Sequence, residues 1–314
     1  MSDVFQFSFN GIAPICILML AGALLKAVRV LDSGTAADIN RLCFRVLIPC
    51  KLFIQLYDAD ITAVTDVPLL ALSLGGTAAV IALLCVTVPR FVPRGPRQGE
   101  YIQGVFRGNS AILGLPLITN LYGEGAAAVL AVPLPMMLIL YNVAAPVILS
   151  VYSGGARPAP AAIARKVASN PFLIGVVLGI AVSLSGLRLP AVLVTSVTRM
   201  GDAGSTMALV VLGALIDLKS FRRSGRLALS AAVLRLGVLS ALVLAVGVLC
   251  GLRDERLAVL ICFFSTPTAV GGYVLAQNMD GDGELAGQIL IVTTLLSAGT
   301  LFATIAVLRG MGLM

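Results

Sequence analysis

Apolar residues fill most of the chain in long runs, which are separated by short groups of charged, proline and glycine residues. A hydrocarbon core about 30 Å thick requires roughly 20 apolar residues per helix. By this measure the pattern predicts ten membrane-spanning helices in an all-α polytopic membrane protein. They are expected at residues 9–29, 38–57, 67–89, 98–121, 125–152, 170–188, 190–217, 227–250, 256–278 and 285–308. The connecting loops are short, the longest being 153–169.

The fourth run contains the stretch GNSAILGLP, which is costly at the centre of a membrane helix. Pro116 has no N–H to donate, and its ring clashes with the carbonyl group four residues earlier. The ninth run has a similar interruption at Pro267, followed by Gly271 and Gly272. Unpaired backbone groups are tolerated at membrane depth only where they face protein or water. Both helices are therefore expected to break at a buried site or a cavity.

The two interrupted runs are related by an internal repeat. A shift of 158 residues places Ser110 over Thr268, Gly114 over Gly272 and Asn120 over Asn278. Residues 1–155 and 156–314 then form two five-helix repeats. Because five is odd, the halves enter the membrane from opposite sides, which makes the repeat inverted. The fourth and ninth helices become the broken crossover helices of the two halves.

Paired breaks in inverted halves are the best sequence indication of a transporter's substrate site. Each break exposes the N-terminus of a half-helix, whose partial positive charge favours an anion. The expected substrate-binding residues are Asn109, Ser110, Gly114, Pro116, Thr266, Pro267, Thr268, Gly271, Gly272 and Asn142. Freed carbonyl groups at the breaks are expected to offer further contacts. The alternative is that each proline kink serves packing alone.

Ionisable residues inside predicted helices are candidates for coupling or charge pairing. Asp202 lies near the middle of the seventh helix, and Arg199 lies one turn before it, so the two can pair on one face. Asp202 is the candidate for a proton or cation coupling site, with a structural pair as the alternative. Arg235 either counters a substrate carboxylate or anchors Asp202. Arg107 either lines an inward vestibule or extends to the membrane surface.

Composition supports the membrane assignment and sets the topology. The chain is 59% hydrophobic and 12% charged, with a mean hydropathy of +1.02. The formal charge of +7 is explained by basic loops that fix orientation, so nucleic acid is not an expected partner. With both termini outside, the cytoplasmic loops contain twelve basic residues and the outer side only four, at 188, 253, 256 and 309.

The chemistry of the chain points away from catalysis. There is no histidine, and the six cysteines are scattered singly through apolar segments, without metal-ligand spacing. No phosphate-binding loop, GxSxG or HExxH sequence is present. We therefore expect no catalytic residues, no metal and no cofactor.

Several segments resemble the auxin efflux carrier family of the bile-acid/auxin carrier superfamily. They are RGNSAILGLPLITNLYGEGAAAVLAV, SNPFLIGVVLGIAVSLSG, GDAGSTMALVVLGALI, STPTAVGGYVLAQNM and TTLLSAGTL. The resemblance extends in order over essentially the whole chain. It implies a secondary transporter with a scaffold bundle and a transport bundle, the latter made of spans 3–5 and 8–10. It places the crossover at residues 109–116 and 267–272, and it implies a homodimer.

The central loop is short where plant members have a long hydrophilic one, so the resemblance implies a bacterial-type carrier of the inner membrane. The expected function is secondary transport of small organic anions, such as auxin-like or malonate-like carboxylates, by alternating access. The coupling ion, H⁺ or Na⁺, stays open. The alternative is a passive anion channel or a transporter-like sensor, and an enzyme is a weaker third interpretation.

Overall fold

The computed structural model describes residues 2–314, apart from 59–65, 124–125, 127–128, 131–132, 154–159, 216–217 and 280. In this part of the chain the regular structure is helical, and the one isolated β-bridge joins Gly108 to Thr268. The first-half helices are α1 (Ser2–Ala27), α2 (Ser33–Leu42), η1 (Cys43–Leu47), α3 (Ile48–Tyr57), α4 (Val67–Thr87), η2 (Val88–Arg90), α5 (Pro96–Phe106), α6 (Ser110–Tyr122) and α7 (Pro133–Val151). The second-half helices are α8 (Pro160–Ala168), α9 (Pro171–Ser185), α10 (Ala191–Leu215), α11 (Leu218–Val233), η4 (Leu234–Leu239), α12 (Ser240–Leu249), α13 (Asp254–Phe264), α14 (Val270–Asn278) and α15 (Gly283–Gly310).

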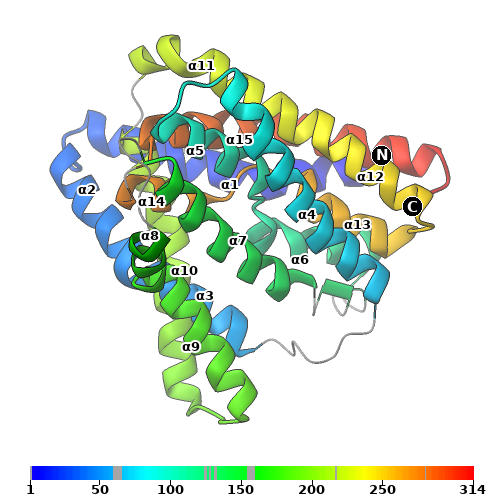
Figure 1. Cartoon of the computed structure of the whole chain (residues 1–314), viewed down its shortest axis with the longest axis horizontal. Helices are drawn as coiled ribbons and strands as arrows, with labels where there is room; N and C mark the ends of the chain where they lie inside the picture. Colours follow the sequence, from blue (N-terminus) through cyan, green and yellow to red (C-terminus); the bar gives the residue numbers. More distant parts are fainter. Residues whose placement is uncertain are drawn as a thin grey trace.

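Several helices have the length and composition of membrane spans. Four of those in the described residues qualify, at Val67–Arg90, Pro133–Val151, Gly225–Leu249 and Gly283–Gly310. A bent pair, Pro160–Ala168 with Pro171–Ser185, qualifies as a fifth if it is counted as one span. The expectation of an all-helical polytopic membrane protein is confirmed at this level. Both chain ends lie at the same end of the molecule (Figure 1).

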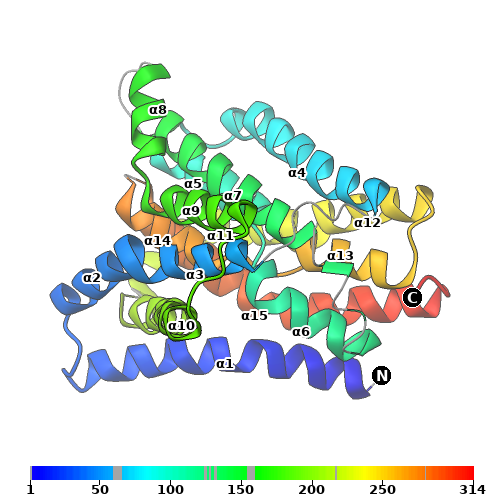
Figure 2. The same cartoon turned by 90° about the horizontal axis from the view of Figure 1, so that it is seen from below.

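One group of helices packs through unusually close contacts. In Figure 2, α10 lies between α1 and α3, and α3 also packs against α9. A Cβ added to Gly175 would lie 2.5 Å from the carbonyl oxygen of Pro49, and one on Gly179 would lie 2.6 Å from that of Phe53. Small residues at this spacing let two membrane helices approach closely. The bundle formed by α1, α2, η1, α3, α9 and α10 is called the first bundle below.

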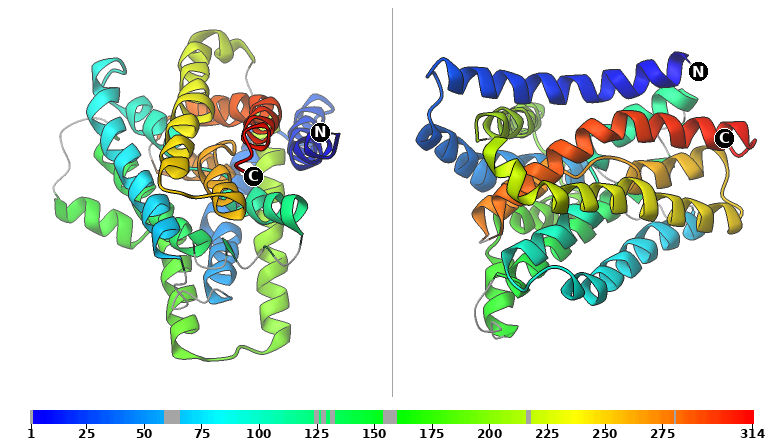
Figure 3. Two further views of the ribbon diagram at one scale, coloured as in Figure 1. Left: turned by 90° about the vertical axis from the view of Figure 1, so that its right-hand side faces the viewer. Right: turned by 90° about the horizontal axis from the view of Figure 1, so that it is seen from above.

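The remaining long helices surround a buried centre, and they form the second bundle: α4 to α7 and α11 to α15. The side chains of α13 from Leu257 to Phe264 are all buried, as are those of α5 from Gln98 to Phe106. The two views of Figure 3 show α13 enclosed by its neighbours on several sides. These two buried helices end at the breaks of the predicted fourth and ninth spans.

The position of the first break differs from the expectation. The backbone is non-helical at residues 107–109, and α6 then runs without interruption from Ser110 to Tyr122, across Pro116. In the second half the break covers residues 265–269 and includes Pro267. The expected break at Pro116 was therefore wrong, whereas the expected break at Pro267 is confirmed. The first break lies where two segments of this chain cross closely, and that crossing requires a glycine at position 108 rather than a proline.

Candidate functional site

The two breaks cross each other in antiparallel orientation. The N–H of Asn109 donates to the carbonyl oxygen of Pro267 at 2.9 Å, and the N–H of Ala269 donates to that of Arg107 at 3.1 Å. A Cβ on Gly108 would lie 2.5 Å from the carbonyl oxygen of Phe263. Only a residue without a side chain permits this approach. The crossing thus pairs backbone groups that two interrupted helices would otherwise leave unsatisfied.

Arg235 fastens the ends of the two half-helices to each other. Its buried guanidinium donates to the carbonyl oxygen of Val105 at 2.6 Å, to that of Phe263 at 3.2 Å and to that of Thr266 at 2.8 Å. Val105 lies in the last turn of α5, and Phe263 in that of α13. The last carbonyl groups of a helix lack intrahelical partners and carry partial negative charge, so a cation is favoured there.

This arrangement corrects two expectations. Arg235 neither faces Asp202 nor lines the cavity described below, because its nitrogens bind backbone carbonyls. The carbonyls expected to be free for a substrate are also engaged, either by Arg235 or by the crossing itself. The broken helices therefore offer a substrate their N-terminal donors, and few acceptors.

The hydroxyl groups of the two threonines in the second break donate to backbone carbonyls of the protein. The hydroxyl of Thr266 donates to the carbonyl oxygen of Cys262 at 2.8 Å. That of Thr268 donates to the carbonyl oxygen of Gly104, and the N–H of Thr268 donates to the hydroxyl of Thr293 at 3.1 Å. Both threonine side chains are buried away from the cavity. Thr268 thus holds the second break against α5 and α15, whereas Thr266 bonds back to its own helix, α13.

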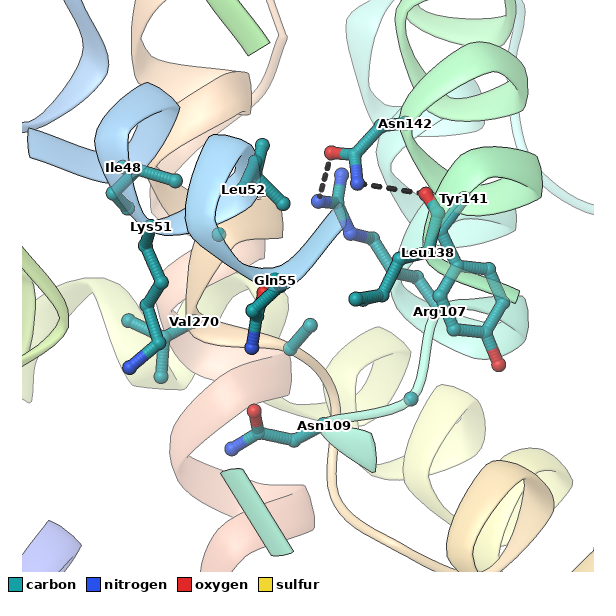
Figure 4. A pocket seen from close by; sticks show the side chains of 13 residues that line it. Ile48, Lys51, Leu52, Gln55, Arg107, Asn109, Leu138, Tyr141, Asn142 and Val270 are labelled. Atoms are coloured by element: carbon teal, nitrogen blue, oxygen red, sulfur yellow. Dashed lines mark hydrogen bonds between the residues drawn. The ribbon is translucent and has the colours of Figure 1, made fainter. Parts of the chain in front are cut away.

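A small cavity of about 60 Å³ lies beside the crossing, between the two bundles. From the first bundle, α3 contributes Ile48, Lys51, Leu52 and Gln55. From the second bundle come the two breaks and α7, with Arg107, Gly108, Asn109, Leu138, Tyr141, Asn142, Ala269, Val270 and Gly271. Figure 4 shows Lys51 and Gln55 on one side of this space and Arg107 with Asn142 on the other.

The cavity is lined by hydrogen-bond donors that lack partners. Arg107 is buried, and its Nη2 donates to Oδ1 of Asn142 at 2.9 Å, but its Nη1 has no partner in the structure as described. The buried Nδ2 of Asn109 has no partner there either. Buried donors that stay unpaired are costly, and such groups need a specific explanation. Two such donors line this one cavity, which makes it a candidate site for a hydrogen-bond acceptor.

The cavity also contains a second cation, whose partner was not expected. Nζ of Lys51 lies 3.2 Å from Oδ1 of Asp202, so this ion pair joins α3 to α10. The ion pairs formed by the described residues join Asp202 to Lys51 and do not include one between Arg199 and Asp202. Cα of Lys51 packs closely against Gly201, which brings Asp202 within reach of Lys51. Asp202 was the acid expected to serve as a coupling site, but its side chain is 68% exposed. A different acid, Glu100, is buried.

The structure brings together only part of the expected site. Of the substrate-binding residues named from the sequence, Asn109, Asn142 and Gly271 line the cavity. Ser110, Gly114, Thr266, Pro267, Thr268 and Gly272 lie at or next to the crossing but not on the cavity wall. The side chain of Pro116 lies outside the described residues. Lys51, Gln55 and Tyr141 were missed as members of the site, and Arg107 was named only as one of two alternatives, the lining of an inward vestibule. A lysine and an arginine inside predicted spans were the available signal.

A family model matches nearly the whole chain. The model of a family described as "Membrane transport protein" matches residues 7–152 and 160–305. It covers both halves of the chain and both breaks.

Individual relatives extend over nearly the whole chain. An "Uncharacterized transporter" of Methanothermobacter thermautotrophicus is 25% identical over 298 residues, which are 94% of this chain and 96% of the relative. A protein of Rhizobium meliloti named "Putative malonate transporter" is 26% identical over 288 residues, 86% of each chain. The "Uncharacterized transporter YfdV" of Escherichia coli K12 is 22% identical over 297 residues, 90% of this chain and 94% of the relative. These relatives are named as transporters and not as enzymes. The chain belongs to this family of membrane transport proteins, the auxin efflux carrier family.

Proposed function

We propose that the protein is a secondary transporter of small organic anions and that the cavity beside the crossing is its substrate site. One observation carries the proposal: Nη1 of Arg107 and Nδ2 of Asn109 are buried donors without partners, and both residues line the same cavity. An acceptor-rich anion would satisfy both. A carboxylate has two oxygens and four lone-pair sites, which match a guanidinium and an amide.

The surrounding backbone favours the same charge. Helices α6 and α14 begin at Ser110 and Val270, directly after the crossing, so their first N–H groups lie beside the cavity. The N-terminus of a helix attracts anions through these unpaired donors and through the helix dipole. The lining contains Arg107 and Lys51 and no acidic residue. A cation would be repelled from this site.

The two cations favour a substrate with two carboxylates. Arg107 belongs to the second bundle and Lys51 to the first, so they approach the cavity from opposite sides. A short dicarboxylate could contact both at once, whereas a monocarboxylate would leave one cation without a partner. The printed name of the Rhizobium relative, "Putative malonate transporter", fits this class. We assign this chain a malonate-like dicarboxylate as its preferred substrate.

Alternating access supplies the transport mechanism. A cavity of about 60 Å³ is smaller than ordinary ligand pockets of about 300–1,000 Å³, so it must widen to admit a substrate of this class. Sliding or rocking of the second bundle against the first would separate Arg107 from α3 and open the cavity to one side at a time. A substrate bridging both bundles favours closure, because it cancels the repulsion between Lys51 and Arg107.

The helices support ten spans in two inverted repeats, residues 1–155 and 156–314. Single spans are α1, α4, α7, α9, α10 and α15; α2 to α3 and α11 to α12 are continuous across π-helical turns; and α5 with α6 and α13 with α14 are the broken spans. Ten spans also fit chain ends at one end of the molecule (Figure 2). With the basic loops inside, both ends face the outer side of a bacterial inner membrane.

The proposal is tested by counterflow in proteoliposomes, with radiolabelled malonate outside and unlabelled malonate inside. Arg107→Gln and Asn109→Ala should each lower the counterflow rate by at least about tenfold, because each removes a hydrogen-bond donor that contacts the anion in the proposed site. Arg226→Gln, at an exposed arginine of α11, is the matched control and should keep the wild-type rate. Normal malonate flux in folded Asn109→Ala would refute the site.

The same protein distinguishes a carrier from a passive anion channel. A carrier gives saturable counterflow and no unitary currents in a planar bilayer. A channel passes many ions per opening and shows no counterflow.

A further inference from the structure

Glu100 is a buried acid that the substrate cavity does not use. It lies in the second turn of α5 and is 1% exposed. The ion pairs of the described residues do not include it. A carboxylate removed from water without a basic partner is strongly disfavoured relative to the neutral acid. A residue of this kind within a span is a candidate for carrying a proton.

The charged surroundings of Glu100 are asymmetric. Around α5 the described charged or titratable groups are Asp282 and Glu284 of α15 and its cap, Tyr273 of α14, Arg226 of α11, Arg235 of η4, Arg90 of η2, Tyr141 and Tyr152 of α7, and Cys85 of α4. Arg107 directly follows α5, seven residues or about two helical turns after Glu100. Asp282 repels a carboxylate and is itself paired with Arg97 at 2.9 Å. Arg107 is thus the cation that favours the ionised form of Glu100.

A hydrogen-bonded residue connects Glu100 to the crossing. Nε2 of Gln103 donates to Oε2 of Glu100 at 2.9 Å and to the carbonyl oxygen of Gly272 at 3.2 Å. Oε1 of Gln103 is buried and has no partner among the described residues. Because the two ends of an amide are assigned from their hydrogen bonds, a turn of this amide would let neutral Glu100 donate to that oxygen. The amide therefore has an arrangement for each protonation state.

We propose that Glu100 is the coupling site of the transporter and that the coupling ion is a proton moved in the same direction as the anion. The inference rests on the proposed transport function. A bound anion neutralises Arg107, which removes the charge that favours ionised Glu100. Glu100 then takes a proton from water on the side to which the cavity is open, and releases it on the other side when the anion has left.

The expected strength of the coupling follows from geometry. Glu100 lies in α5 and Arg107 directly follows its last residue, so the two are about 10 Å apart along the helix axis. One charge at about 10 Å in a medium of effective dielectric constant about 20 changes an equilibrium by roughly tenfold. By linkage the effect is reciprocal, so a bound proton strengthens anion binding by the same factor. Lowering the pH should therefore lower the apparent malonate Kd by up to about tenfold.

The experiment uses proteoliposomes with a pH-sensitive dye inside and malonate as the probe. Wild-type protein should acidify the lumen when malonate is added outside, and an inside-alkaline pH gradient should drive accumulation. Glu100→Gln should keep malonate counterflow at equal pH but lose both proton movement and gradient-driven accumulation. Glu284→Gln is the control. It changes an exposed acid in the first turn of α15 and should behave as wild type.

Three results would overturn the proposal: no malonate-driven proton movement in wild type, proton movement that persists in Glu100→Gln, or loss of counterflow in folded Glu100→Gln. If Glu100→Gln does not fold, Glu100→Asp decides the question, because it should keep proton movement with a shifted pH midpoint. An unchanged pH profile in Glu100→Asp would then count against the proposal. Failure of wild-type counterflow would instead refute the transport function itself.

Discussion

The N–H of Asn109 donates to the carbonyl oxygen of Pro267 at 2.9 Å, although the two residues are 158 positions apart in the chain. This separation equals the shift that aligns the two halves of the sequence. Residues related by a two-fold axis can bond to each other only where the axis passes between them. The bond is what the proposed inverted repeat would produce if its pseudo-two-fold axis passed through the crossing.

Gly108→Ala is expected to disrupt the crossing. Its Cβ would lie 2.5 Å from the backbone oxygen of Phe263 and 2.6 Å from Nη2 of Arg235, so the two breaks would have to separate. Overpacking of this kind costs about 1–3 kcal/mol. We expect a lower melting temperature in detergent and a large loss of malonate counterflow. Gly299→Ala, on α15 with open space around it, is the control and should be neutral or slightly stabilising. A wild-type melting temperature in Gly108→Ala would contradict the close approach.

Arg235→Lys should also destabilise the protein, although it preserves the charge. The guanidinium of Arg235 reaches three carbonyl oxygens in different directions, and an ammonium group cannot reproduce this fork. Hydrogen bonds to charged groups contribute about 1.5–3 kcal/mol each, so losing one or two should lower stability measurably. Thermal unfolding in detergent checks this, with Arg309→Lys at an exposed site as control. Equal stability of the two variants would show that Arg235 acts through its charge alone.

Much of the helical arrangement could be predicted from the sequence because the hydrophobic signal is long and regular. The run expected at 170–188 corresponds to α9 at Pro171–Ser185, and the run expected at 285–308 to α15 at Gly283–Gly310. The two breaks were expected in the correct runs, since glycine and proline are rare in such segments for a physical reason. The exact position of the break near Asn109 could not be derived, because it depends on contact with a segment 158 residues further along the chain.

The site was harder to predict, since its polar groups divide their roles through tertiary contacts. Thr268 and Asn109 look alike in sequence as polar residues beside a break. In the structure, Thr268 donates to the backbone of Gly104, whereas the Nδ2 of Asn109 has no partner among the described residues. Lys51 was overlooked because its span contains other basic residues, Arg41 and Arg45, and no local pattern distinguishes it from them.

The proposed orientation can be measured with the native cysteines. Cys250, at the end of α12, is exposed, whereas Cys43 and Cys262 are buried. With both termini outside, Cys250 faces the outer side of the membrane. A membrane-impermeant maleimide should therefore label intact cells or right-side-out vesicles, and Cys250→Ser should abolish the labelling. Ser169→Cys in that background, in the exposed turn between α8 and α9, should be labelled only in inverted vesicles. The reverse pattern would invert the topology.

Lys51 should determine whether the transporter prefers dicarboxylates. Lys51→Met removes the cation on the α3 side of the cavity but leaves Arg107 and Asn109 in place. A substrate with one carboxylate bound at Arg107 should lose little, whereas malonate loses its second ionic contact. A hydrogen bond to a charged group is worth about 1.5–3 kcal/mol, so malonate affinity should fall by roughly tenfold to a hundredfold. Competition of acetate and malonate in counterflow measures the change.

Asp202 gives the complementary variant. It holds Lys51 at 3.2 Å in the described conformation, so it competes with the substrate for the same ammonium group. Asp202→Asn should therefore raise malonate affinity. The increase is limited to a few-fold, because the Asp202 side chain is 68% exposed and its ion pair is screened by solvent.

Lys26→Met, at an exposed lysine of α1, is the control for Lys51→Met. If Lys51→Met lowers acetate and malonate transport equally, Lys51 does not recognise the second carboxylate, and the dicarboxylate assignment is wrong.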